Sequence, residues 1–147
     1  MADELTEARH AAVRMLAMRE HSRVELVRKL ERRHAPETVA QVLDELAAQG
    51  LQSDERFAEQ YVHSRRNKGY GPVRIRAELV ERGIADGLIS RELDGFGNEE
   101  WRSLMHEVAQ RRFGATPPED RREMARRGRF LASRGFPSWM INEYLFG

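Results

Sequence analysis

The sequence contains no cysteine, which excludes disulfide bonds and thiolate metal sites. It also lacks any apolar run approaching the roughly 20 residues that a helix needs to cross a bilayer. The first ten residues, MADELTEARH, are polar and acidic, unlike a secretory signal peptide. These absences together predict a soluble, cytoplasmic protein that does not associate with membranes.

Motifs for catalysis and for cofactor binding are missing as well. There is no GxxxxGK[ST] loop for nucleotide phosphates and no GxGxxG turn for a dinucleotide. The five histidines form no pair at the spacing of metal ligands on one helix face, and no serine has an obvious catalytic base. We therefore predict no catalytic residue, no metal and no cofactor, and a protein that is not an enzyme.

Lysine is scarce, because only Lys29 and Lys68 among the 25 basic residues are lysines. Arginine suits carboxylate and phosphate recognition, but a genomic bias toward arginine would give the same composition, so only the placement is informative. The net charge of +1 conceals a strong segregation. Six acids and one base fall from Glu37 to Glu59, whereas six arginines and one glutamate fall from Arg121 to Arg134.

Acidic residues are also absent from Gln60 to Ala77, in the middle of the chain. Five cations lie in this stretch: Arg65, Arg66, Lys68, Arg74 and Arg76. Tyrosines and a Gly-Tyr-Gly-Pro turn are interleaved with them. A basic helix, a tight turn and a second basic helix would form one cationic corner, which suits a polyanionic partner.

The cations of this corner differ in how readily helix stability explains them. Arg65 and Arg66 lie near a helix C-terminus, where the dipole favours cations, whereas Arg74 and Arg76 lie early in the next helix, where it disfavours them. Tyr70 either stacks on a base or packs over the turn. A second basic helix, around Arg126, is weaker evidence because acids in the same helix can pair with its arginines. The candidate partner-binding residues are Arg65, Arg66, Lys68, Tyr70, Arg74, Arg76, Arg126 and Arg127.

Apolar residues recur at helical spacing throughout, and glycine or proline separates the periodic segments. The pattern predicts an all-α protein of about nine helices, at residues 5–19, 22–33, 36–49, 53–67, 72–82, 85–93, 98–113, 117–134 and 137–146. Ser22–Glu25 and Thr116–Glu119 fit capping boxes. Pro36, Pro72 and Pro117 fit first helical positions, and Gly50, Gly69, Gly83, Gly114 and Gly135 fit helix ends.

The predicted helices group in threes. VELVRKLERRH, VRIRAELVERG and MARRGRFLASRG occupy matching places, so that Leu30, Leu79 and Leu131 align and should be buried. His34 stands where the other two repeats have glycine, and would have to tolerate the helix-ending conformation at some cost. We expect tandem three-helix units at residues 1–50, 51–96 and 97–147, stacked in an elongated body.

The run DERFAEQYVHSRRNKGYGPVRIRAELVERGI resembles the central signature of the RecX family, bacterial regulators of the RecA recombinase. AVRMLAMREHSRVELVRKL resembles the family's first segment, and VAQRRFG with RFLASRGF its third. The resemblance implies tandem three-helix repeats in a curved, extended molecule. It further implies a regulator that lodges in the RecA–single-stranded DNA filament and inhibits strand exchange, ATP hydrolysis and co-protease activity. We expect the protein to be a monomer.

Two other functions stay open at this stage. A helical protein could bind DNA without RecA, with the Gly-Tyr-Gly-Pro corner as a helix–turn–helix-like element. A small nuclease is a third class, which the missing metal constellation disfavours. A requirement for recombinase on the DNA strand would separate the first two.

Overall fold

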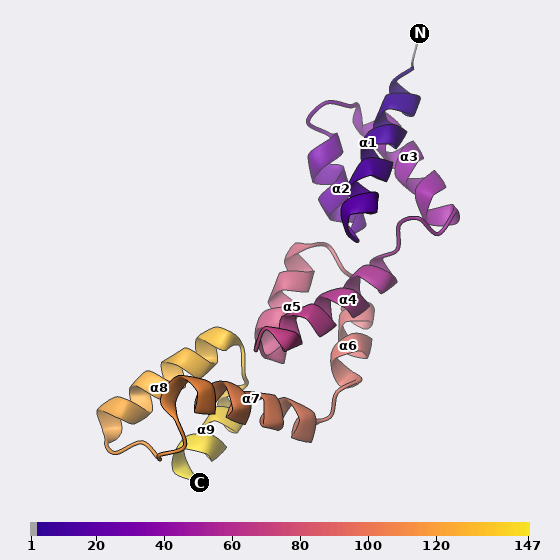
Figure 1. The fold of residues 1–147 in the computed structure, drawn as a ribbon. Coiled ribbons are helices and arrows are strands. Elements are labelled where there is room, and N and C mark those ends of the chain that lie inside the picture. Colours follow the sequence, from indigo (N-terminus) through magenta and orange to yellow (C-terminus); the bar gives the residue numbers. More distant parts are fainter. Residues whose placement is uncertain (1–2) are drawn as a thin grey trace. The chain divides into compact units, whose positions relative to one another are not determined.

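The computed structural model describes residues 3–147, and this part of the chain forms nine helices and no strand (Figure 1). The helices are α1 Glu4–Met18, α2 Arg23–Leu30, α3 Pro36–Ala48, α4 Asp54–Asn67, α5 Pro72–Glu81, α6 Asp86–Asp94, α7 Asn98–Phe113, α8 Arg121–Arg134 and α9 Ser138–Phe146. The all-helical prediction is confirmed. All but two of the predicted helix ends lie within one residue of the observed ends.

The predicted start of α8 is wrong. The helix begins at Arg121, and the side chain of Asp120 caps it by accepting a hydrogen bond from the Glu123 amide at 2.9 Å. Thr116–Glu119 is therefore not a capping box, and Pro117 is not the first helical residue. The cause is local, because Pro118 disfavours the helical conformation at the residue before it.

The predicted end of α2 is wrong too. The helix stops at Leu30, and the next residues form a turn in which the amides of Arg33 and His34 both donate to the Leu30 carbonyl, at 3.1 and 3.0 Å. No described residue other than glycine has a positive φ. His34 therefore avoids the cost predicted for it, because the helix ends before His34 is reached.

The other predicted helix signals are confirmed. Ser22 and Glu25 form a reciprocal capping box at the start of α2, and Pro36 and Pro72 are first helical residues. The five glycines expected at helix ends all have positive φ: Gly50, Gly69, Gly83, Gly114 and Gly135. Local chemistry thus determines most of the element boundaries.

The chain divides into two compact units. The first contains the chain up to Gln60 together with Leu79–Leu88, and the second contains Tyr61–Glu78 and Ile89–Gly147. In the first unit, α1, α2 and α3 pack on one another around a core of Ala8, Ala12, Leu26, Leu30, Val39, Val42, Leu43 and Leu46. In the second unit, α7 packs on α8 and α8 packs on α9. The predicted domain limits at residues 50 and 96 stay a prediction.

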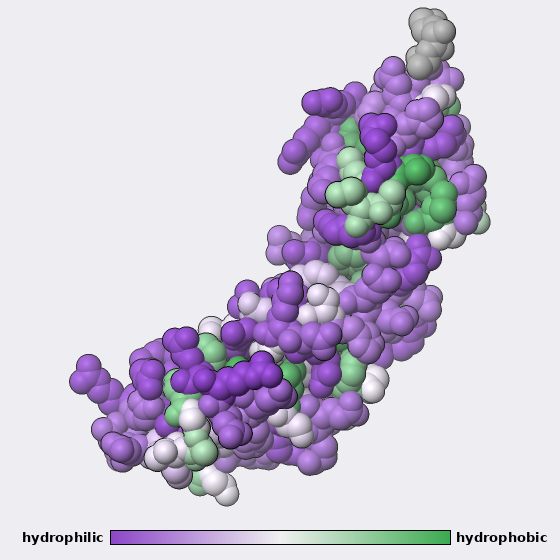
Figure 2. Space-filling model, in the orientation of Figure 1, coloured by the Kyte–Doolittle hydropathy of each residue, from purple (hydrophilic) through white to green (hydrophobic). Residues whose placement is uncertain are grey.

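The leucines that align between the repeats are all buried, as predicted. Leu30 is 2% exposed, and Leu79 and Leu131 are fully buried. Each lies in the middle helix of its three-helix group, α2, α5 or α8. The surface is hydrophilic by contrast, and Figure 2 shows charged and polar residues over most of the face drawn.

Two glycines bring middle helices into close contact. Within the first unit, a Cβ added to Gly83 would lie 2.7 Å from the Val24 Cβ, at the start of α2. Within the second unit, a Cβ on Gly135 would lie 2.6 Å from the Arg74 backbone nitrogen, at the start of α5. There the Val73 amide donates to the Gly135 carbonyl at 2.9 Å. In both places the glycine after one middle helix meets the start of the preceding middle helix.

Candidate partner-binding surface

Tyr70 lies in the turn between α4 and α5, and its ring is surrounded by guanidinium groups. Arg65 at the end of α4 lies 3.9 Å from the ring centroid, Arg74 at the start of α5 lies 4.4 Å away, and Arg134 at the end of α8 lies 4.7 Å away. Arg134 also donates to the Lys68 carbonyl at 3.1 Å. The Tyr70 ring thus packs against arginines of its own chain, and stacking of this ring on a base stays a prediction.

Glu78 on α5 provides the negative charge for this cluster. Nε and Nη2 of Arg65 each donate to its carboxylate at 2.9 Å, Arg74 Nε at 3.1 Å and the Tyr61 hydroxyl at 2.9 Å. The side chains of Arg65 and Glu78 are both 18% exposed. Burial raises the pKa of Glu78, but the hydrogen bonds from Arg65, Arg74 and Tyr61 outweigh it and hold that pKa below its usual range.

The cationic corner is thus partly neutralised within the chain. Arg74 additionally donates to the Ser133 carbonyl at 3.0 Å, so this guanidinium connects α5 with α8. The stability of α5 alone gives no reason for an arginine at this position, and the contact with α8 provides one. We name Arg65, Tyr70, Arg74, Glu78 and Arg134 the Tyr70 cluster.

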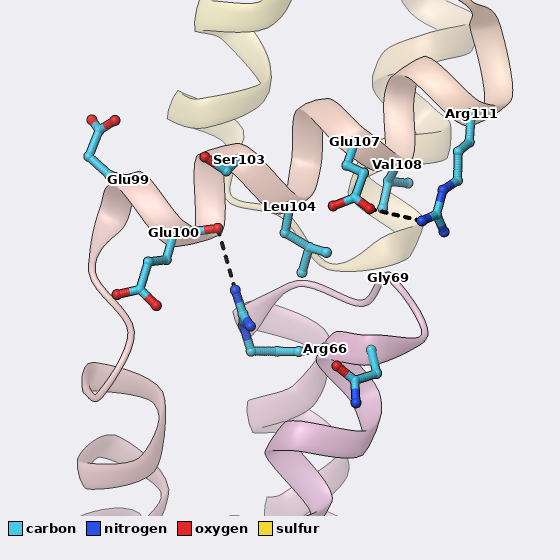
Figure 3. Close-up of a pocket in the computed structure, with 10 residues that line it drawn as sticks. Arg66, Gly69, Glu99, Glu100, Ser103, Leu104, Glu107, Val108 and Arg111 are labelled. Carbon is cyan, nitrogen blue, oxygen red and sulfur yellow. Dashed lines mark hydrogen bonds and ion pairs between the residues drawn. The ribbon is translucent and has the colours of Figure 1, made fainter.

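Arg66 occupies a separate place, against α7. Its guanidinium lies 4.0 Å from the Phe96 ring centroid and 4.8 Å from that of Trp101, and it donates to the Glu100 carbonyl at 3.4 Å (Figure 3). Burial lowers the pKa of Arg66. It lines a groove of about 480 Å³ that also holds the carboxylates of Glu99, Glu100 and Glu107. The groove is therefore lined by residues of both charges.

The two remaining residues of the corner are more accessible. Lys68 is exposed and its ammonium group has no ion pair with a described residue. Arg76 is half-buried and donates to the Ser90 hydroxyl at 3.1 Å, without a carboxylate partner in the described chain. Lys68 and Arg76, like Arg66, therefore have no carboxylate partner among the described residues.

Arg126 and Arg127 share one carboxylate on α8. Arg126 contacts Glu123 through two nitrogens at 3.0 and 2.9 Å, and Arg127 contacts it at 2.9 Å while donating to the Tyr144 hydroxyl at 2.9 Å. These hydrogen bonds lower the pKa of Glu123 to about 2. Arg127 is only 5% exposed, so its main contacts are within the chain.

Sequence reasoning missed a third group of cations, at the end of α2. Arg28, Lys29, Arg32 and Arg33 are all exposed, and none has an ion pair or hydrogen bond from its side chain within residues 3–147. We name these four residues the α2 basic turn. The run RKLERR carried the signal, but its sequence was interpreted only as part of the repeat.

No helix within residues 3–147 is long and apolar enough to span a membrane. No cluster of three or more histidine, aspartate or glutamate side chains in the same range could hold a metal ion.

Comparison with known proteins gives three matches in tandem. Residues 8–46 match the profile described as "RecX, first three-helix domain", residues 53–93 match the second such domain and residues 99–145 match the third. The chain belongs to the RecX family. The RecX repeats predicted from the sequence are therefore confirmed in number and order.

Relatives and solved structures agree with this assignment. "Regulatory protein RecX" of Pseudomonas savastanoi pv. phaseolicola is 46% identical over 146 residues, covering 99% of this chain and 94% of the relative. The protein of the same name from Halorhodospira halophila is 50% identical over 129 residues, covering 87% and 80%. A crystal structure of regulatory protein RecX matches with a TM-score of 0.82 at 28% identity, covering 98% of this chain and 72% of that one.

The structure of RecX from Lactobacillus salivarius is similar in fold, with a TM-score of 0.83 at 21% identity over 99% of this chain and 97% of that one. The names of the relatives describe a regulatory protein. This RecX family member is therefore a regulator rather than an enzyme, as predicted.

Proposed function

We propose that this RecX family member binds the RecA filament on single-stranded DNA and inhibits the recombinase, ATPase and co-protease activities of RecA. The observation that carries the proposal is the match of all three RecX domains, in order, over most of the chain. A regulator of chromosomal recombination would act in the cytoplasm, which agrees with the location predicted from the sequence.

The exposed cations support this proposal physically. A filament on DNA presents phosphates and carboxylates, and guanidinium groups bind both. The α2 basic turn brings four exposed cations together at the end of α2, and none of the four forms an ion pair within the described chain. The Tyr70 cluster, in contrast, uses Glu78 to hold two of its arginines. We therefore place the main polyanion contact at the α2 basic turn, with Lys68 and Arg76 as further candidates.

The test is the DNA-dependent ATPase of RecA, titrated with this protein. ATP hydrolysis should fall at amounts below one regulator per recombinase subunit, because a blocked filament affects many subunits at once. Unchanged hydrolysis with the regulator in excess would contradict the proposal. Binding of bare single-stranded DNA in the absence of RecA would then support the alternative of a RecA-independent DNA-binding protein, which the exposed α2 basic turn also allows.

Neutralising the α2 basic turn should weaken filament binding. In Arg28→Gln/Arg32→Gln, two phosphate contacts are lost, so the slope of log K against log salt should become shallower by about 1.4 on single-stranded DNA. Binding isotherms at three or more salt concentrations would measure this slope.

A matched control removes the same charge elsewhere. In Arg19→Gln/Arg111→Gln, both arginines are exposed but already paired, with Glu25 at 3.2 Å and with Glu107 at 2.8 Å. This variant should bind nearly as well as the parent. If both double variants lost affinity equally, the net charge of the protein rather than the α2 basic turn would govern binding.

A further inference from the structure

An apolar groove runs between α8 and α9 in the second unit. It has a volume of about 550 Å³, and its lining includes Ala125, Gly128 and Ala132 from α8 and Leu145 and Phe146 from α9. Phe146 is 70% exposed, so a large aromatic side chain is available at this surface. None of the lining residues is acidic.

The α8 side of the groove is a strip of small residues. Ala125, Gly128 and Ala132 follow one another at spacings of three and four, so they share one face of the helix. Ala125 and Ala132 are exposed. Small residues at this spacing let the backbone of another helix approach closely, and an amphipathic helix commonly binds in such a groove.

Two arginines flank the strip. Arg121 and Arg129 both line the groove, both are exposed, and neither has an ion pair with any described residue. Arg121 is the first residue of α8, where the helix dipole disfavours a cation, so helix stability does not explain it. Asp120, which precedes this helix, and Glu123, its one acid, line a different groove together with Arg126. The two arginines thus have no counter-charge in their own groove.

The spacing of Arg121 and Arg129 defines where a ligand of this groove should carry its negative charges. Eight residues of helix separate the two arginines, which corresponds to about 12 Å along the axis, or two turns. We infer that the α8–α9 groove binds an amphipathic helix of a protein partner, which inserts apolar side chains between α8 and α9 and carries two carboxylates about two turns apart. Nucleic acid is a poor occupant, because a phosphate backbone has no apolar groups to fill the lining.

The inference deepens the proposed function, since the partner protein is then the recombinase in its filament. The test uses Ala125→Tyr, which fills the groove from an exposed position. Its matched control is Ala47→Tyr, the same change at an exposed alanine of α3. Fluorescence anisotropy of the labelled protein would measure affinity for RecA filaments on single-stranded DNA, and circular dichroism would check the helix content of each variant.

Ala125→Tyr should lower the affinity at least about tenfold, because the bound helix and the new ring cannot occupy the same space. Ala47→Tyr should bind like the parent. Arg121→Glu/Arg129→Glu should also weaken binding, through repulsion of the carboxylates. Parent-like binding by folded Ala125→Tyr would overturn the inference. A parent dimer in sedimentation that Ala125→Tyr dissociates would also overturn it, by assigning the groove to a second copy of the chain.

A separate readout distinguishes failure of the groove from failure of the proposed function. If the parent does not bind the filament, the proposed function fails. Helix binding in the α8–α9 groove is then tested by nuclear magnetic resonance with a synthetic probe. The probe is an amphipathic helical peptide with leucines on one face and glutamates at positions i and i+8. Shifts of the Ala125, Gly128 and Ala132 amides on its addition would support the groove, and their absence would overturn it.

Discussion

Gly135→Ala should lower the free energy of unfolding by about 2–5 kcal/mol, the sum of a left-handed backbone penalty and a steric clash. Gly135 has a φ of 97°, which disfavours a side chain. The added methyl group would also lie 2.6 Å from the Arg74 backbone nitrogen. Relief would require α8 to move away from α5 and would stretch the hydrogen bond from the Val73 amide to the Gly135 carbonyl. Urea denaturation followed by circular dichroism would measure the loss.

Substitutions at Gly50 and Gly71 allow the steric clash and the left-handed backbone penalty to be measured separately. Gly50 has a φ of 74° but nothing within 4 Å of an added Cβ, so Gly50→Ala should cost only about 1–2 kcal/mol. Gly71 is the reverse case, since its φ is not positive and an added Cβ would lie 2.5 Å from the Gly135 carbonyl oxygen. Equal losses for Gly135→Ala and Gly50→Ala would show that the close approach of α5 and α8 contributes nothing.

Glu78→Ala should destabilise the second unit by about 2–4 kcal/mol, because it removes the counter-charge from two partly buried guanidiniums. Arg65 and Arg74 would then face each other around Tyr70 without a carboxylate, and the Tyr61 hydroxyl would lose its acceptor. Thermal unfolding would measure the effect. Glu119→Ala is the control, because Glu119 is exposed and unpaired within the described residues, and this variant should unfold like the parent.

The Glu78 carboxylate also predicts that the free energy of unfolding falls at acidic pH. The pKa of Glu78 is lower in the folded protein than in the unfolded chain, where it is about 4.3. The unfolded state therefore binds a proton first, and the stabilisation present above about pH 4.3 is lost as the pH falls through the folded value. Glu78→Gln should be less stable near neutral pH and should lose less stability on acidification. A parallel decline of parent and variant would contradict this assignment.

The helices were predictable because their signals are local. A proline at the first position or a glycine at the end acts within a few residues, and such signals located most boundaries. The two errors were also local, at places where two signals compete. Pro118 overrides the apparent cap at Thr116, and the turn after Leu30 spares His34 from a left-handed conformation.

Whether each arginine is paired within the chain could not be predicted, because the pairing depends on contacts between residues that are distant in the sequence. Glu78 lies 13 residues after Arg65, and Arg134 lies 66 residues after the carbonyl that it binds, that of Lys68. Helix periodicity predicts which face a residue occupies but not which neighbouring helix meets that face. Arg65 and Arg74 were therefore predicted to bind a partner, whereas the exposed cations of α2 were interpreted only as part of a repeat.

The glycine contacts between successive middle helices give the RecX repeat series a direction. Gly83 and Gly135 each accept the start of the preceding middle helix, but the equivalent position in the first domain is His34, whose side chain is only 11% exposed and lies 3.9 Å from Glu4 on α1. An imidazole there blocks the backbone approach that glycine permits. Adding another three-helix domain before the first one, with the same contact between middle helices, would therefore require His34 to be replaced by glycine.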